Sequence, residues 1–239
     1  MTKVFDNSRM ASEYCAQTVI DLVREKPSAM ICLAAGHTSL EMFGALISAY
    51  RDGRVDFSKI RLVDMDEWVG LMPQDDGSCE GFLRKNLYDH INVQENNIRM
   101  FNGRAADLER ECRDMDEHIA SGGGIDYMLL GLGMNGHLAL NEPGVNPESC
   151  SHVVPLDSVT RKVAVKYFKE MPDITQGITL GIKNILETRH VQLLITGGRK
   201  NDIVKELMGS QPTAELPGTL LKGRANVEIV LDKLAAGTK

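Results

Sequence analysis

The sequence predicts an α/β protein built on a single, doubly wound and mostly parallel sheet with helices on both faces. Short apolar runs, typical of buried strands, alternate along the chain with segments whose apolar residues recur at helical spacing. Polar and glycine-rich clusters follow several of these strands directly. This alternation is typical of Rossmann-like folds, in which ligands bind beyond the carboxyl ends of the strands. The polar clusters are therefore the candidate functional residues.

The first two units establish the pattern. Residues 8–25 carry apolar side chains at helical spacing and are followed by Pro27, so we expect a helix there. The apolar run over 29–35 predicts a buried strand, and helical spacing returns over 40–50. The loop at 36–39 thus joins the carboxyl end of a strand to the amino end of a helix, which is a natural anion site.

Four further strands and two further helices continue this alternation toward the C-terminus. No internal repeat, low-complexity segment or long linker interrupts it, so we expect residues 1–239 to form one domain. The strands are expected at 60–65, 125–132, 191–196 and 227–231, and the helices at about 78–90 and 202–208.

Composition argues against several classes of function. A net charge of −6 without a basic patch is unsuited to nucleic acid. No stretch has the roughly 20 apolar residues that cross a bilayer, and residues 1–10 lack the apolar core of a signal peptide, so we expect a cytoplasmic protein that does not bind membranes. The five cysteines form no CxxC pair and the histidines show no HxxxH or HxH spacing, so we expect neither disulfides nor a metal.

The segment "LLGLGMNGHLALNEPG", which begins at residue 129, has two interpretations. It contains the GxGxxG string of dinucleotide-binding loops, but those loops need a long helix after the last glycine, and Pro143 interrupts here within two turns. The same segment carries an amide, an imidazole and a carboxylate, Asn135, His137 and Glu142, which converge on one pocket if the loop folds back. We favour a catalytic loop.

Together with "MDEWVGL" at 65–71, this segment resembles the glucosamine/galactosamine-6-phosphate deaminase and isomerase family. The resemblance continues through "GITLGIKNIL", "ITGGRK" and "LPGTLLKGRANVEIVLD", and the "NEPG" ending differs from the related 6-phosphogluconolactonases. It implies conversion of a 2-amino-2-deoxyhexose 6-phosphate to a ketohexose 6-phosphate and ammonia, without a cofactor. Asn135 and "GITLGIK" are more similar to the galactosamine branch than to the glucosamine branch.

The resemblance also implies a role for each catalytic residue. Asp66 matches the base that abstracts the proton at C2, His137 matches the acid/base that opens the sugar ring, and Glu142 matches the carboxylate that orients the imidazole. Asn135 departs from the pattern, because many deaminases of the family carry Asp there. Either its amide hydrogen-bonds the imidazole and tunes the site for a galacto-configured substrate, or it only holds the loop by tolerating left-handed backbone.

The substrate phosphate is expected at the loop over 36–39, held by backbone N–H groups and a hydroxyl. Lys200 matches a basic phosphate contact of the family. Lys166 stands where the family has an arginine, so a point charge would replace a bidentate fork, although a plain surface lysine is the competing interpretation. The expected substrate-binding and phosphate-binding residues are Gly36, His37, Thr38, Ser39, Glu67, Gly136, Lys166 and Lys200.

Two alternatives of different classes stay open. The first is another sugar-phosphate isomerase or a 6-phosphogluconolactonase-like hydrolase on the same scaffold. The second is a non-catalytic sugar-phosphate sensor, although a regulator of this kind adds a helix-turn-helix segment for which the sequence has no room before Met30. In each case the expected partner is a small-molecule sugar phosphate, and a homo-oligomer is compatible with the sequence.

Overall fold

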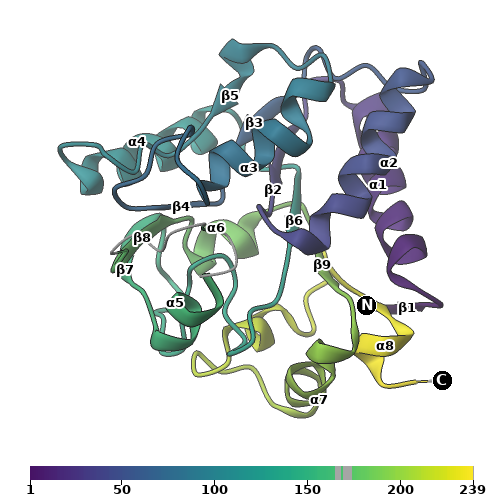
Figure 1. Cartoon of the computed structure of the whole chain (residues 1–239), viewed down its shortest axis with the longest axis vertical. Helices are drawn as coiled ribbons and strands as arrows, with labels where there is room; N and C mark the ends of the chain where they lie inside the picture. Colours follow the sequence, from purple (N-terminus) through teal and green to yellow (C-terminus); the bar gives the residue numbers. More distant parts are fainter. Residues whose placement is uncertain (165–167, 169–173, 239) are drawn as a thin grey trace.

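A seven-stranded, fully parallel sheet forms the centre of the computed structural model, which describes residues 1–164, 168 and 174–238 (Figure 1). The strand order is β1-β10-β9-β6-β2-β3-β5. After β2, strands are added along the chain first on one side of it and later on the other. The helices that connect them therefore cover both faces of the sheet, as in a doubly wound fold. The strands are β1 Thr2–Phe5, β2 Met30–Leu33, β3 Arg61–Val63, β5 Ile98–Arg99, β6 Tyr127–Leu130, β9 His190–Ile195 and β10 Val227–Asp232.

The central strands are buried on both faces. In β2, Met30 and Cys32 belong to one core cluster, whereas Ile31 and Leu33 belong to the cluster on the opposite face. This arrangement explains why the sequence shows continuous apolar runs rather than alternation.

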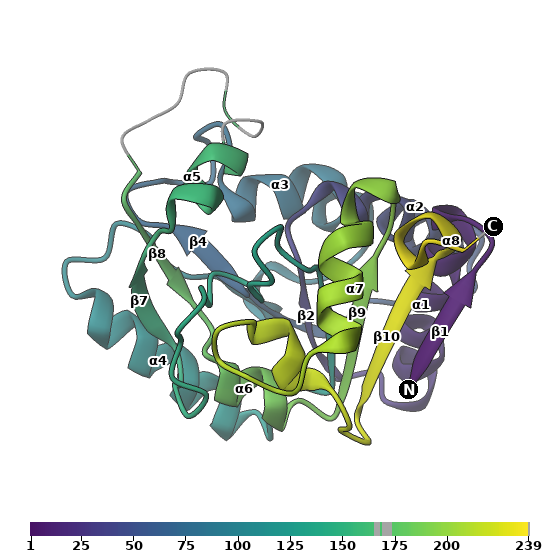
Figure 2. The same ribbon diagram turned by 90° about the horizontal axis from the view of Figure 1, so that it is seen from below.

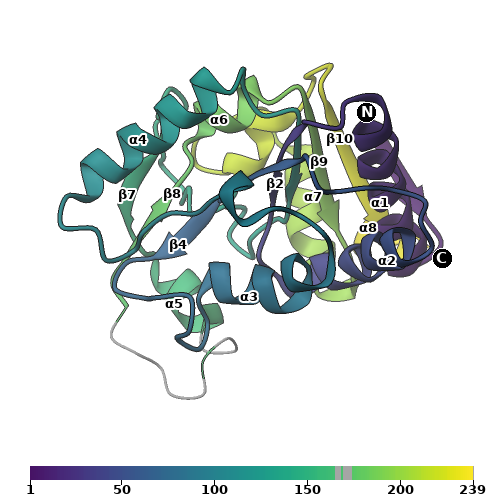
Figure 3. The same ribbon diagram turned by 90° about the horizontal axis from the view of Figure 1, so that it is seen from above.

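Helices cover both faces of this sheet (Figures 2 and 3). Buried side chains of α1, α2 and α3 form one core cluster with the sheet, and those of α4, α6 and α7 form the other. Within the described ranges, no helix is both long enough and apolar enough to span a membrane. The helices are α1 Ser8–Glu25, α2 Leu40–Arg51, α3 Cys79–Asn86, α4 Leu108–Ser121, α5 Ser158–Ala164, α6 Ile182–Glu187, α7 Asn201–Gly209 and α8 Lys233–Ala236.

A second, three-stranded sheet lies beside the first and was not predicted from the sequence. It consists of β4 Asp66–Trp68, β8 Gln176–Thr179 and β7 His152–Pro155, paired antiparallel in that order. Its strands are short, and β7 is partly exposed throughout, so their apolar pattern is weak.

The doubly wound, mostly parallel fold predicted from the sequence is confirmed, with differences at element ends. The helix expected at 8–25 is α1 with the same bounds, but the strand expected over 60–65 is only Arg61–Val63. The helix expected over 78–90 breaks at Leu87, whose φ of −143° is not helical, and ends in a short 3₁₀ turn.

Three polar loops open at one edge of the central sheet. They follow β2, β6 and β9, which lie next to or near one another in the strand order. Because all three strands are parallel, their carboxyl ends meet at the same edge. The loops singled out in the sequence are therefore brought together by the sheet.

Candidate active site

A cavity of about 1100 Å³ lies at this edge of the sheet. The loops after β2, β6 and β9 form most of its wall, and Met65, Asp66 and residues of α5 complete it. Of the residues expected from the sequence, Gly36, His37, Thr38, Ser39, Asp66, His137 and Lys200 line the cavity.

Asp66 begins β4, so its carboxylate stands where the chain leaves the central sheet. Burial raises its pKa to about 6, against a lowering contribution from the thiol of Cys79, whose Sγ lies 3.4 Å from Oδ1. The neighbouring Glu67 raises the same pKa further, and His137 lowers it. A carboxylate that titrates near neutrality can both accept and return a proton.

His137 lies opposite a buried carboxylate. Its Nδ1 is 3.5 Å from Oε2 of Glu142 and 3.2 Å from the hydroxyl of Thr160. Burial alone would raise the pKa of Glu142, but hydrogen bonds with His137, Thr160 and Asn135 bring it below its usual value. An ionised Glu142 favours the tautomer with the proton on Nδ1, which leaves Nε2 as the basic nitrogen.

Close approach of the chain fixes the position of this imidazole. A Cβ atom on Gly133 would lie 2.5 Å from the His137 ring, so only glycine fits beneath it. The two residues are also joined by a hydrogen bond of 3.0 Å from the amide of Gly133 to the carbonyl of His137. The glycine-rich string therefore holds a histidine in place.

Asn135 contacts Glu142 and the backbone, and it does not line the cavity. Its amide nitrogen donates to Oε2 of Glu142 at 2.9 Å, and its Oδ1 accepts from the backbone N–H of His137 at 3.3 Å. The expectation that Asn135 itself takes up left-handed backbone is wrong, because the positive φ of this turn, 81°, belongs to Gly136. Asn135 is placed to hold the loop and the carboxylate.

Two expected substrate-binding residues do not line the cavity. Glu67 is buried, and its two oxygens accept from the hydroxyl of Ser78 and from the backbone N–H groups of Trp68, Cys79 and Glu80 at 2.7 to 3.1 Å. It caps α3, because Ser78, Cys79 and Glu80 lie at the start of that helix. Gly136 packs against Leu216, where a Cβ would lie 2.1 Å from Cδ1.

Two helices begin at the cavity. The 3₁₀ turn His37–Ser39 leads into α2, and the 3₁₀ turn Gly198–Lys200 leads into α7. Ser39 donates its hydroxyl to the carbonyl of Ala34 at 2.8 Å and so holds the first turn. Lys200 donates to the carbonyl of Leu132. The two helix ends and the ammonium group of Lys200 make this part of the cavity suited to a phosphate.

Four polar residues of the cavity wall, Thr160, Lys162, Thr196 and Arg199, were not expected from the sequence. Arg199 could have been found, because it adjoins Lys200 in "ITGGRK". Thr160 carried no signal, since it reaches His137 from 23 positions along the chain. Lys166 lies outside the described residues. Among the residues that are described, no three His, Cys, Asp or Glu side chains are grouped to hold a metal ion.

Comparison with known proteins identifies the family. A model described as glucosamine-6-phosphate isomerases/6-phosphogluconolactonase matches residues 6–230. The chain belongs to this family. A glucosamine-6-phosphate deaminase of Thermoanaerobacter pseudethanolicus is 37% identical over 231 residues, which cover 96% of this chain and 91% of the relative. A glucosamine-6-phosphate deaminase of Clostridium botulinum strain Loch Maree is 34% identical over 234 residues, 98% of this chain and 96% of the relative.

Solved structures of the same family share the fold. A monomeric glucosamine-6-phosphate deaminase superposes with a TM-score of 0.95 at 31% identity, covering 100% of this chain and 99% of the other. The 6-phosphogluconolactonase of Trypanosoma brucei has a TM-score of 0.74 at 20% identity, covering 99% of this chain and 97% of the other. The second likeness shows a common fold alone.

The cap at Glu67 generates a prediction that separates a structural role from substrate binding. Glu67→Gln presents an amide to four donors and should lower the free energy of unfolding by about 1–3 kcal/mol. The KM for substrate should change less than threefold. Urea denaturation and steady-state kinetics measure the two effects, with the exposed Glu109→Gln as control. A KM raised tenfold at unchanged stability would show that Glu67 binds substrate instead.

A second prediction concerns Asn135→Asp. The substitution removes the donor to Oε2 of Glu142 and places a second carboxylate 2.9 Å from it, so the two negative charges repel and Glu142 orients His137 less firmly. The kcat/KM at neutral pH should fall about three- to tenfold, while the acidic limb of the profile should stay in place. Because Asn135 does not line the cavity, the ratio of kcat/KM for the two amino-sugar epimers should stay the same. A changed ratio would make Asn135 a determinant of substrate choice after all.

Proposed function

We propose that this protein converts a 2-amino-2-deoxyhexose 6-phosphate to a ketohexose 6-phosphate and ammonia by coupled isomerisation and deamination. The main support is that two candidate acid/base groups line the same cavity. They are Asp66, with a pKa of about 6, and His137, whose Nδ1 faces the carboxylate of Glu142. The relatives named glucosamine-6-phosphate deaminase support it.

The proposed chemistry needs only proton transfers and water. His137 takes the proton of the O1 hydroxyl through Nε2 and delivers it to the ring oxygen, which opens the ring to an aldehyde. Asp66 then takes the C2 proton, the electron pair of that bond forms the C1–C2 double bond, and O1 receives the electron pair of the carbonyl and a proton from water, which gives an enolamine. Asp66 returns its proton to C1 as the lone pair of the nitrogen forms a C2 imine. Water adds to the resulting C2 imine, the C–N bond breaks, and ammonia leaves with the ketose phosphate.

The phosphate is proposed to lie between the start of α2 and the start of α7. Backbone N–H groups over 36–39 and the hydroxyl of Thr38 would hold it on one side. The ammonium group of Lys200 and the guanidinium of Arg199 would hold it on the other, where Arg199 supplies a fork that a lysine lacks. Lys166 is proposed as a further phosphate contact on the basis of the sequence alone.

The choice of epimer is the finer part of the proposal. We infer that glucosamine 6-phosphate is a substrate, because the two relatives compared above are named for it. The case for galactosamine 6-phosphate rests on Asn135 and on "GITLGIK" at 177–183, and the contacts of Asn135 give its part of the case no support. Galactosamine 6-phosphate stays in the test as the competing substrate.

Ammonia release from a panel of substrates tests this function. The panel contains glucosamine, galactosamine and mannosamine 6-phosphates, with glucose 6-phosphate and 6-phosphogluconolactone for the alternative reactions. We expect ammonia from glucosamine 6-phosphate with a kcat/KM at least tenfold above that for the other two amino sugars. Lactone hydrolysis without ammonia would favour the hydrolase, and binding without any turnover would favour a sensor.

Replacing the proposed base gives a sharper prediction. Asp66→Asn should lower kcat by a factor of about 10²–10⁴ with KM within threefold, because only a transition-state proton transfer is lost. In the wild type, kcat/KM should fall about tenfold per pH unit below pH 6, since the base must be ionised and the pKa of Asp66 is about 6. Steady-state kinetics from pH 4.5 to 9 measure both effects, with Asp114→Asn on α4 as control. Activity of Asp66→Asn within threefold of wild type would refute the role.

A further inference from the structure

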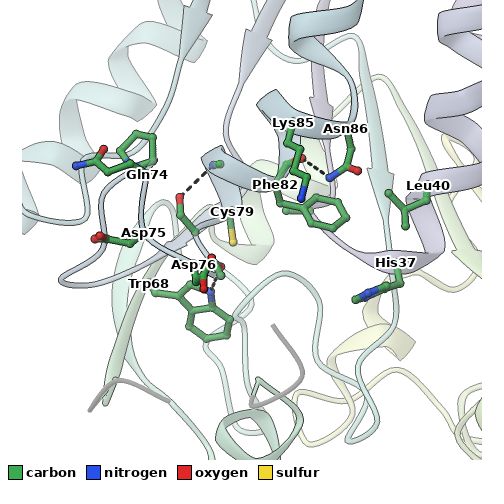
Figure 4. Close-up of a pocket in the computed structure, with 15 residues that line it drawn as sticks. His37, Leu40, Trp68, Gln74, Asp75, Asp76, Cys79, Phe82, Lys85 and Asn86 are labelled. Carbon is green, nitrogen blue, oxygen red and sulfur yellow. Dashed lines mark hydrogen bonds between the residues drawn. The ribbon is translucent and has the colours of Figure 1, made fainter. Parts of the chain in front are cut away.

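A second cavity, the side pocket, lies next to the active-site cavity (Figure 4). It has a volume of about 440 Å³ and is lined by residues along the whole of α3, by the loop that precedes α3, and by Trp68. The two cavities share Ala35 and His37. Cys79, the first residue of α3, lines the side pocket, and its thiol also reaches Asp66.

The position of this thiol is fixed at both ends. The Sγ atom lies 3.4 Å from Oδ1 of Asp66, and the backbone N–H of Cys79 donates to Oε1 of Glu67 at 3.0 Å. Because Glu67 is anchored by the other donors at the start of α3, Cys79 moves little relative to β4. Oδ2 of Asp66 accepts no hydrogen bond from any other residue that the structure describes.

The thiol acts as a donor and not as a nucleophile. Burial raises the pKa of Cys79 well above its usual value, and the nearby carboxylates of Glu67, Asp66 and Asp64 raise it further. A thiol in such surroundings stays protonated at neutral pH, and a protonated thiol is unreactive. Its proton is therefore available to the carboxylate of Asp66.

We propose that Cys79 is a positioning residue that holds Oδ1 of Asp66 through its S–H group, so that Oδ2 is directed at the reacting carbon of the substrate. This inference rests on the proposed function of Asp66 as the base. Nothing in the sequence marks Cys79 for this role, since it lies 13 positions from Asp66 on a different element.

The charges around Asp66 explain why one weak donor matters. Glu67, beside it along the chain, disfavours a second negative charge, and the charge of Asp66 in turn raises the pKa values of the buried Asp64 and Cys32. Among the groups that the structure describes, His137 and Cys79 favour the ionised form. Loss of the thiol should therefore raise the pKa of Asp66 above its present value of about 6.

The pH profile of Cys79→Ala and Cys79→Ser tests the proposal. The acidic limb of kcat/KM should move to higher pH by about half to one unit in Cys79→Ala, with a loss of about two- to fivefold at pH 6 and a smaller loss at pH 8. Cys79→Ser restores a donor and should lie closer to wild type than Cys79→Ala. Cys112→Ala, which removes a buried thiol from α4, is the matched control and should leave the limb in place.

A readout independent of activity separates this inference from the proposed function. The carboxyl ¹³C resonance of Asp66, assigned with Asp66→Asn, should titrate at higher pH in Cys79→Ala than in wild type. If the titration shifts but the wild-type protein releases no ammonia, the hydrogen bond from Cys79 to Asp66 is supported and the proposed function is refuted. An unchanged titration in Cys79→Ala, or one equally displaced in Cys112→Ala, would overturn the positioning role.

Discussion

Two acidic side chains, Asp64 and Glu67, are buried and a third, Asp66, is half-buried where the chain passes from the central sheet into the small one. Burial of several negative charges together is prohibitive unless each is hydrogen-bonded or neutral. Burial raises the pKa of Asp64 well above its usual value, and its oxygens accept only the backbone N–H groups of Met65 and Phe101. The carboxylate of Glu67 accepts hydrogen bonds from residues at the start of α3. Of these three carboxylates, Asp66 is the one that lines the cavity. The passage of the chain from the central sheet to the small one therefore determines the positions of both the small sheet and the candidate base.

The small sheet in turn holds the loop that carries His137. Asn141 is fully buried, and its amide donates to the carbonyls of Leu138 and Leu180, which ties the loop to the end of β8. Ala139, on the cavity wall, has a φ of 54°, a conformation that a residue with a Cβ adopts only when its surroundings enforce it. Loop and sheet therefore form one unit, and the geometry of His137 depends on both.

The sequence predicts the parts of this molecule that depend on local pattern. Continuous apolar runs predict strands buried on both faces, and β2 and β6 are such strands. Asn135, His137 and Glu142 lie in one loop and contact one another, so a short motif contains most of that group. The cap at Glu67 and the contact of Thr160 with His137 depend on segments far apart in sequence, and no local periodicity encodes them. The antiparallel sheet was missed for the same reason, because short and partly exposed strands have little pattern.

Different parts of the two sheets supply the phosphate-binding and the acid/base residues of the candidate site. The loops after β2 and β9 belong to the central sheet and supply the two helix starts and Lys200, which suit a phosphate. Asp66 instead begins β4 of the small sheet, and His137 lies on the loop after β6, which Asn141 ties to the end of β8. A change in the small sheet can therefore alter the acid/base groups while the phosphate site stays intact.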